Sequence, residues 1–140
     1  MKALSLWQPW ASLMAAGLKT IETRDWPTRY RGPLAIHAAK RPLTRMDKAL
    51  MYEWACKGLL PSSWMGRELP FGAIVAVVDV LDCRRTDSLW GELSAKEAEY
   101  GNYESGRWGW ITRNVRPLEP PIPWHGMQGL FEITDGLVIP

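Results

Sequence analysis

The first forty residues alternate between short apolar runs and one segment of helical periodicity. Ala3–Trp7 is apolar enough for a strand. The helical spacing begins at Pro9, where a missing backbone N–H does no harm, and it ends at Gly17, which is expected to adopt a positive φ. Thr20–Arg24 alternates as a strand with two faces, and Leu34–Ala39 follows a turn rich in Pro, Arg and Gly as another strand. This part of the chain therefore predicts three strands and one helix.

The middle of the chain holds one helix and the clearest strand of the sequence. Thr44, with Asp47 three residues later, resembles a helix-capping pair, and the apolar positions that follow support a helix ending at Gly58. A loop over 61–70 leads to Ala73–Leu81, which is rich in Val and almost continuously apolar. Such a strand is expected at the centre of a sheet, covered on both faces.

Polar and proline-rich segments interrupt the last third of the chain. Residues 87–106 are polar and acidic, which predicts an irregular or partly helical excursion. Trp108–Val115 alternates as a strand, the proline-dense stretch 117–123 is expected to be a loop or a sheet edge, and Gly129–Thr134 is the last strand. The five or six strands and two helices do not alternate regularly. This order favours an α+β fold, a small mixed β-barrel with helices packed on it, in a single domain over 1–140.

Composition excludes several classes of protein. With 46% hydrophobic and 23% charged residues, the chain has the balance of a globular domain. Its longest apolar run falls far short of the roughly 20 residues that span a bilayer, and the N-terminus lacks a signal-sequence pattern, so we expect no membrane association and a cytoplasmic protein. Cys56 and Cys83 form no CxxC pair and have no ligand spacing with a histidine, so we expect no disulfide scaffold, no metal and no cofactor.

The small net charge of +2 conceals an uneven distribution. Residues 1–48 contain nine basic and three acidic residues, a net charge of +6, whereas the remaining 92 residues contain eight basic and twelve acidic residues, a net charge of −4. This asymmetry predicts an electropositive face and an anionic partner. Four bases near the strand predicted at 20–24 form a candidate strip for nucleic-acid phosphates: Arg29, Arg31, Lys40 and Arg41.

Tryptophan is unusually frequent, with nine residues against two phenylalanines. An indole ring offers a large flat face that serves a core or stacks on a base. Trp10 lies on the apolar stripe of the first predicted helix and is assigned to the core. Trp26, in a polar turn just after Arg24, is the candidate for stacking on a ligand.

A specific set of motifs covers the segment from 4 to 42. These are Leu-Ser-Leu-Trp-Gln-Pro-Trp-Ala-Ser at 4–12, Gly17-x-Lys19-x-x-Glu22-x-Arg24, Trp26, and Arg31-Gly32. In this order they resemble the ASCH family, which is named for homology to the activating signal cointegrator. The resemblance continues through 72–83 and 108–115 to Gly126-x-Gln128-Gly129-Leu130-Phe131, and so covers most of the chain.

The resemblance implies a β-barrel related to the PUA fold, with a cleft beside the first helix that the Gly-x-Lys-x-x-Glu-x-Arg residues line. The implied role is binding of RNA or another nucleic acid. Some members are hydrolases: small bacterial ones deacetylate acetylcytidine, and another branch is described as ribonucleases.

The resemblance and the residue chemistry together define a candidate ligand-binding set: Gln8, Ser12, Lys19, Glu22, Arg24 and Trp26. Lys19 is expected at the mouth of its strand, where its ammonium donates to a phosphate or a ligand carbonyl. Glu22 and Arg24 project from the same strand face, so they either grip one ligand together or form a purely structural ion pair. Gln8 and Ser12 are expected to contact a base edge, unless Gln8 only caps the helix.

Two other functions are compatible with the same residues. An enzyme would be a metal-independent hydrolase with Lys19 and Glu22 at its catalytic centre. The acetylcytidine-cleaving relatives carry Thr where Glu22 stands here and use a later glutamate, which aligns near 97–101, so this chain lacks their nucleophile. A ribonuclease would need Lys19, Glu22, Tyr30 and His37 to converge. The third possibility is a protein-interaction module with an exposed tryptophan surface. We expect a monomer that binds RNA, another nucleic acid or a nucleotide-like ligand.

Overall fold

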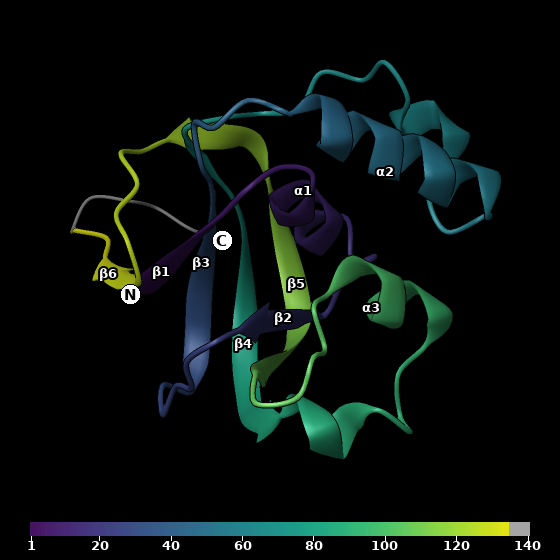
Figure 1. The fold of residues 1–140 in the computed structure, drawn as a ribbon. Coiled ribbons are helices and arrows are strands. Elements are labelled where there is room, and N and C mark those ends of the chain that lie inside the picture. The colour runs from purple at the N-terminus through teal and green to yellow at the C-terminus, as the bar shows by residue number, and fades with distance from the viewer. Residues whose placement is uncertain (135–140) are drawn as a thin grey trace.

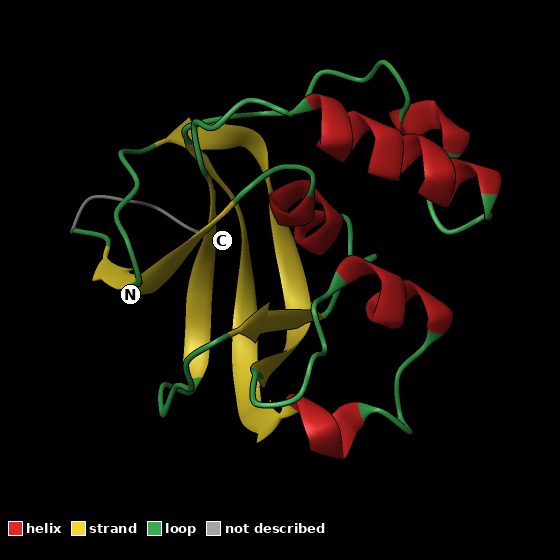
Figure 2. Cartoon of the chain, viewed as in Figure 1, coloured by secondary structure: helices red, strands yellow, loops and turns green. Residues whose placement is uncertain are grey.

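The structure, a computed structural model, describes residues 1–134 as one six-stranded sheet that curls into a half-barrel (Figure 1). The strands lie in the order β2-β5-β4-β3-β1-β6; β1 and β3 run parallel, and the other four neighbouring pairs are antiparallel. The strands are β1 (Lys2–Leu6), β2 (Ile21–Arg24), β3 (Gly32–Ala38), β4 (Ala73–Arg85), β5 (Trp108–Pro123) and β6 (Leu130–Glu132). The α-helices, which gather along one side of the sheet (Figure 2), are α1 (Trp10–Ala15), α2 (Arg45–Cys56) and α3 (Ala95–Tyr100). The predicted α+β fold class is confirmed.

Two strands are longer than the hydrophobic pattern predicts. β4 continues past Leu81 to Arg85, because β5 runs beside it as far as the pair Arg85–Trp108. The prediction that the following strand ends at Val115 is wrong, since β5 continues through the proline-dense stretch 117–123 and pairs with the start of β4. β2 covers only the first residues of β5, so the prolines lie where β5 has a free edge and need no second partner. Of the two predicted alternatives for this stretch, the sheet edge is confirmed.

The predicted helices form, with small shifts at their ends. α1 begins at Trp10, and Gly17 beyond its end has a φ of 74°, as expected. α2 carries a complete capping box: Thr44 Oγ1 accepts from the Asp47 N–H at 3.0 Å, and Asp47 Oδ2 accepts from the Thr44 N–H at 2.9 Å. The excursion at 87–106 is partly helical, since it contains α3. Within residues 1–134, none of the helices is long and apolar enough to cross a bilayer.

Three apolar clusters fill the space around the sheet. The first lies inside the curl, where Leu4 and Trp110 pack with residues of α1. The second joins α1 and α2 to the end of α3 through Trp54 and Tyr100. The third surrounds Phe131 on the opposite face of β1 and β3. The central strands are therefore covered on both faces, as the apolar run of β4 predicts.

Candidate functional site

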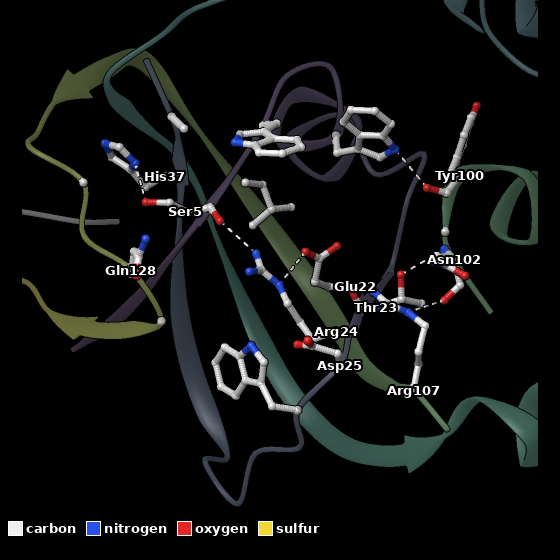
Figure 3. Close-up of a pocket in the computed structure, with 18 of the residues that line it drawn as sticks. Ser5, Glu22, Thr23, Arg24, Asp25, His37, Tyr100, Asn102, Arg107 and Gln128 are labelled. Carbon is white, nitrogen blue, oxygen red and sulfur yellow. Dashed lines mark hydrogen bonds and ion pairs between the residues drawn. The ribbon is translucent and has the colours of Figure 1, made fainter. Parts of the chain in front are cut away.

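A large pocket opens beside the end of β1 (Figure 3). β6 pairs with β1 only from Lys2 to Leu4, so the edge of β1 beyond Leu4 faces the pocket rather than another strand. Its volume of about 1080 Å³ slightly exceeds the roughly 300–1,000 Å³ typical of small-molecule sites. The polar and indole side chains that line it include Ser5, Trp7, Trp10, Glu22, Thr23, Arg24, Asp25, Trp26, His37, Lys40, Asn102, Arg107, His125 and Gln128.

Glu22 and Arg24 stand together on the side of β2 that faces the pocket (Figure 3). Arg24 Nε donates to Glu22 Oε2 at 3.0 Å, and Arg24 Nη2 donates to the backbone oxygen of Ser5 at 2.8 Å. Within residues 1–134, Arg24 Nη1 has no hydrogen-bond partner. The predicted projection of both side chains from one strand face is confirmed. The guanidinium connects β2 to the edge of β1 and leaves the Nη1 amino group without a protein partner among the described residues.

Lys19 is buried and does not line the pocket. Its side chain is 1% exposed, its Nζ lies 3.3 Å from Glu22 Oε1, and it donates to the backbone oxygen of Ile21. The expected position at the mouth of the strand is therefore not found. The ammonium lies behind Glu22 instead, where it holds the carboxylate between two positive charges, its own and that of Arg24.

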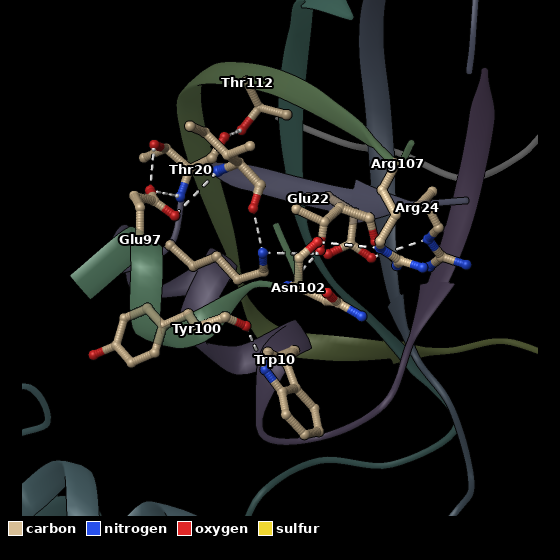
Figure 4. Close-up of polar contacts among 12 residues, drawn as sticks. Trp10, Thr20, Glu22, Arg24, Glu97, Tyr100, Asn102, Arg107 and Thr112 are labelled. Carbon is tan, nitrogen blue, oxygen red and sulfur yellow. Dashed lines mark hydrogen bonds and ion pairs between the residues drawn. The ribbon is translucent and has the colours of Figure 1, made fainter. Parts of the chain in front are cut away.

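Glu97 fastens α3 to the start of β2 (Figure 4). Its Oε2 accepts from both the backbone N–H and the hydroxyl of Thr20, each at 2.7 Å. The segment 97–101, where the family resemblance placed a glutamate of the hydrolases, thus lies next to β2. Its carboxylate binds Thr20 rather than Lys19 or Glu22.

Among the pocket residues that the sequence did not assign to the site are Ser5, Asn102, Arg107 and Gln128. The N–H of Asn102 donates to Thr23 Oγ1 at 3.0 Å, and Arg107 Nε donates to the backbone oxygen of Asn102 at 3.1 Å. These contacts bring the end of the polar excursion against β2, where it forms one wall of the pocket. The only signal for this wall in the sequence is the acidic, polar composition of residues 87–106, and that composition identifies no individual pocket residue.

Gln8 and Ser12 form a buried contact at the start of α1 and do not line the pocket. Gln8 Oε1 accepts from the Ser12 N–H at 2.9 Å, while Gln8 Nε2 donates to Ser12 Oγ at 2.7 Å and to the backbone oxygen of Pro70 at 2.8 Å. The two side chains satisfy each other inside the protein. The contact of Gln8 with the first turn of α1 agrees with a capping role, and the structure does not bring either residue to the pocket.

Indole rings border the pocket at different depths. Trp26 is half-buried and packs edge-to-face on Trp110, with ring centroids 4.9 Å apart. Trp10 packs against two of the apolar clusters, as predicted for a core position. Trp7 lies at the rim, is 55% exposed, and has the guanidinium of Arg41 3.9 Å from its ring centroid. Trp7 therefore has the most exposed indole of the pocket wall.

The four bases of the predicted phosphate strip do not lie together. Lys40 lines the pocket, and Arg41 is held beside it by the ring of Trp7 and by an ion pair of 3.0 Å with Asp47. Arg29 and Arg31 lie outside the pocket, before and at the edge of β3. One basic side chain of the four thus faces the pocket directly.

The pocket carries no excess of positive charge. Its charged lining residues are three basic and three acidic ones: Arg24, Lys40, Arg107, Glu22, Asp25 and Glu99. The net charge of +6 in residues 1–48 is therefore not concentrated there. A balanced pocket favours a ligand that combines hydrogen-bond donors and acceptors over a long polyanion.

His37 is the buried titratable group of the pocket wall, 1% exposed. Its Nδ1 lies 2.9 Å from Ser5 Oγ, and its Nε2 lies 2.7 Å from the backbone oxygen of Trp124. Burial is the main reason why the pKa of His37 is lower than its usual value, and the nearby His125 lowers the pKa further. The Trp124 carbonyl opposes this shift without cancelling it.

Folding stability is expected to fall as the pH is lowered from about 7 to 5, in part because of His37. The unfolded chain binds a proton on this ring near its usual pKa, whereas the folded chain resists the proton because its pKa is depressed. The contribution of neutral His37 is complete above the unfolded pKa and is lost as the pH falls through the folded value. Thermal melts of wild type and His37→Gln across this range measure the effect, and parallel pH profiles of the two would contradict it.

The comparison with known families decides the identity of the fold. A model of the ASCH domain matches residues 4–122, which run from within β1 almost to the end of β5 and include the whole Gly17-to-Arg24 motif. The chain belongs to the ASCH domain family. The match covers every wall of the pocket except the loop at 125–129.

This ASCH domain has curated relatives and solved structural neighbours. It is 39% identical over 83 residues to Activating signal cointegrator 1 of Homo sapiens and of Mus musculus; the match covers 57% of this chain but only 14% of either relative. The crystal structure of ASCH from Zymomonas mobilis aligns with a TM-score of 0.57 at 16% identity, over 96% of this chain and 87% of that one. A point mutant of the same protein gives a TM-score of 0.57 at 18% identity, over 96% and 90%. At these identities the likeness shows the fold.

Proposed function

We propose that this ASCH domain binds RNA or another nucleic acid, and that its pocket receives one unpaired nucleotide of the strand. The observation that carries the proposal is the pocket, a cavity of about 1080 Å³ that holds the Glu22–Arg24 pair and has an exposed Trp7 at its rim. Membership of the family supports the proposal, because the resemblance implies nucleic-acid binding.

Glu22 and Arg24 offer acceptors and donors side by side, which is the pattern that a base edge recognises. Arg24 keeps its Nη1 for a ligand, and the carboxylate of Glu22 stays in place because Lys19 and Arg24 hold it from two sides. Trp26 adds an apolar surface, since its half-buried ring also lines the pocket. In this proposal the base is bound between Trp26 and the ion pair.

Trp7 and Lys40 mark the side from which the strand enters. Arg41 covers one face of the Trp7 ring at 3.9 Å, so a neighbouring base stacks on the other face. The ammonium of Lys40, on the same part of the wall, neutralises a phosphate. Arg29 and Arg31, outside the pocket, remain candidates for phosphate contacts further along the strand.

Trp7→Ala is expected to weaken binding of single-stranded RNA about 10-fold, because stacking on an aromatic ring contributes roughly 1–3 kcal/mol per base. Trp90→Ala is the matched control: the two indoles are 55% and 54% exposed, and Trp90 does not line the pocket. Fluorescence anisotropy with labelled single-stranded and duplex RNA and DNA measures the affinities. Equal losses in the two variants, or tighter binding of duplex than of single strands, would contradict this prediction.

Hydrolysis of RNA or of a modified nucleoside is the second candidate, and the contact of 3.3 Å between Lys19 Nζ and Glu22 Oε1 favours it. A carboxylate that lines the pocket, with an ammonium fixed behind it, can accept a proton from a ligand hydroxyl. Running the titration products on a gel separates the two functions. Cleavage that Glu22→Gln abolishes would support the hydrolase, whereas binding with intact oligonucleotide would support the binding module.

A further inference from the structure

A serine and a histidine that the proposed function does not use form a hydrogen-bonded pair in the pocket wall. Ser5 of β1 and His37 of β3 are direct partners in the parallel ladder, which places both side chains on the same face of the sheet. Ser5 Oγ lies 2.9 Å from His37 Nδ1 (Figure 3), and both residues line the pocket. The register of two paired strands, rather than a loop, therefore fixes the contact.

The second ring nitrogen of His37 determines the direction of this hydrogen bond. Nε2 lies 2.7 Å from the backbone oxygen of Trp124, and a carbonyl oxygen can only accept. Nε2 therefore carries the proton of the neutral ring, Nδ1 is the acceptor, and the Ser5 hydroxyl donates to it. Burial keeps the ring neutral at neutral pH, because it lowers the pKa of His37. A hydroxyl, a neutral imidazole and a group that orients the imidazole are the parts of an activated nucleophile.

Two neighbours complete the surroundings of a reacting serine. Arg24 Nη2 donates to the backbone oxygen of Ser5 at 2.8 Å, so a guanidinium is held against the strand that carries the serine. Gly126 packs over the pair: a Cβ atom there would lie 2.5 Å from His37 Cε1 and 2.9 Å from Ser5 Oγ. The glycine and the pair all line the pocket, from which a substrate approaches, and the missing side chain at 126 leaves room for the pair.

We propose that Ser5 is a nucleophile activated by His37 and that the pocket hydrolyses carboxylic esters. Ser5 Oγ attacks the ester carbonyl carbon while its proton passes to His37 Nδ1. The bond to the alcohol oxygen then breaks, and Nδ1 returns the proton to that oxygen. Water attacks the acyl-serine with His37 again as the base, which releases the carboxylic acid and restores the hydroxyl.

A fluorophosphonate probe, which exchanges its fluoride for a serine oxygen, tests this proposal on the full chain. We expect one adduct per chain, located at Ser5 by peptide mass mapping, and a burst of nitrophenolate from para-nitrophenyl acetate. Ser5→Ala should abolish both, and His37→Gln should slow the labelling about 100-fold. Ser63→Ala, a change at an exposed serine outside the pocket, should leave both as in wild type.

No adduct at Ser5, or equal labelling of wild type and Ser5→Ala, would overturn the proposal. Ser5→Ala removes one partly buried hydroxyl, and a thermal melt close to that of wild type shows that a loss of labelling is not a loss of folding. Because the measurement contains no nucleic acid, its failure is distinguishable from a failure of the proposed binding function.

Discussion

Lys19→Ala is expected to lower the free energy of unfolding by about 3 kcal/mol, a loss typical of removing one partner of a buried ion pair. The lysine side chain is 1% exposed, and its Nζ contacts both Glu22 Oε1 and the backbone oxygen of Ile21. Truncation to alanine leaves a cavity, and the backbone oxygen at the start of β2 loses its hydrogen-bond donor. Urea denaturation followed by tryptophan fluorescence measures the change.

Arg24→Ala is the contrasting variant. Its side chain is 23% exposed against 1% for Lys19, so the loss of its ion pair with Glu22 should lower the free energy of unfolding by less than Lys19→Ala does. Its effect is expected on ligand binding instead, because the guanidinium lines the pocket. A Lys19→Ala protein as stable as wild type would show that the contacts of the ammonium with Glu22 and Ile21 add no net stability.

Trp54→Ala is expected to lower the free energy of unfolding by about 4 kcal/mol, as for other fully buried aromatic side chains. The indole is 1% exposed and packs edge-to-face on Trp10 and Tyr100, with centroid distances of 6.2 and 5.0 Å. It thereby joins α2 to α1 and α3. Denaturation of the variant in urea measures the loss.

Trp54→Phe is the control for this variant, and it should lower the free energy of unfolding much less than Trp54→Ala does. It keeps an aromatic ring in the cluster and removes Nε1–H, a buried donor that has no hydrogen-bond partner within residues 1–134. If Trp54→Phe and Trp54→Ala lower the free energy of unfolding equally, the indole N–H rather than the packed ring accounts for the stability, which contradicts the packing argument.

Local signals in the sequence locate most elements of the fold. The capping box of Thr44 and Asp47 and the positive φ of Gly17 are short-range features, and both appear as predicted. The extent of β5 is not a local property. Prolines lower strand propensity wherever they stand, but at 117–123 they follow an edge that β2 leaves uncovered, and only the sheet order shows this.

The candidate site also combines features that the local sequence predicts with features that depend on the tertiary structure. The pairing of Glu22 with Arg24 follows from strand alternation, so the sequence predicts it. The inward direction of Lys19 does not follow, because alternation cannot reveal that Glu22 supplies a buried partner. Ser5 and His37 lie 32 residues apart, and the parallel register of β1 and β3 alone brings them within 2.9 Å.

The position of β1 between β3 and β6 has a consequence for the order of assembly. Residues 2–4 pair with 130–132, so the first strand obtains its second partner only after nearly the whole described chain has been synthesised. Folds with many such distant pairings typically take milliseconds to seconds to form, because closing a long loop costs entropy before the contacts compensate for it. Until β6 arrives, one edge of β1 is open to pairing with another chain. The pocket needs both the end of β1 and the loop at 125–129, so an emerging chain completes this pocket late.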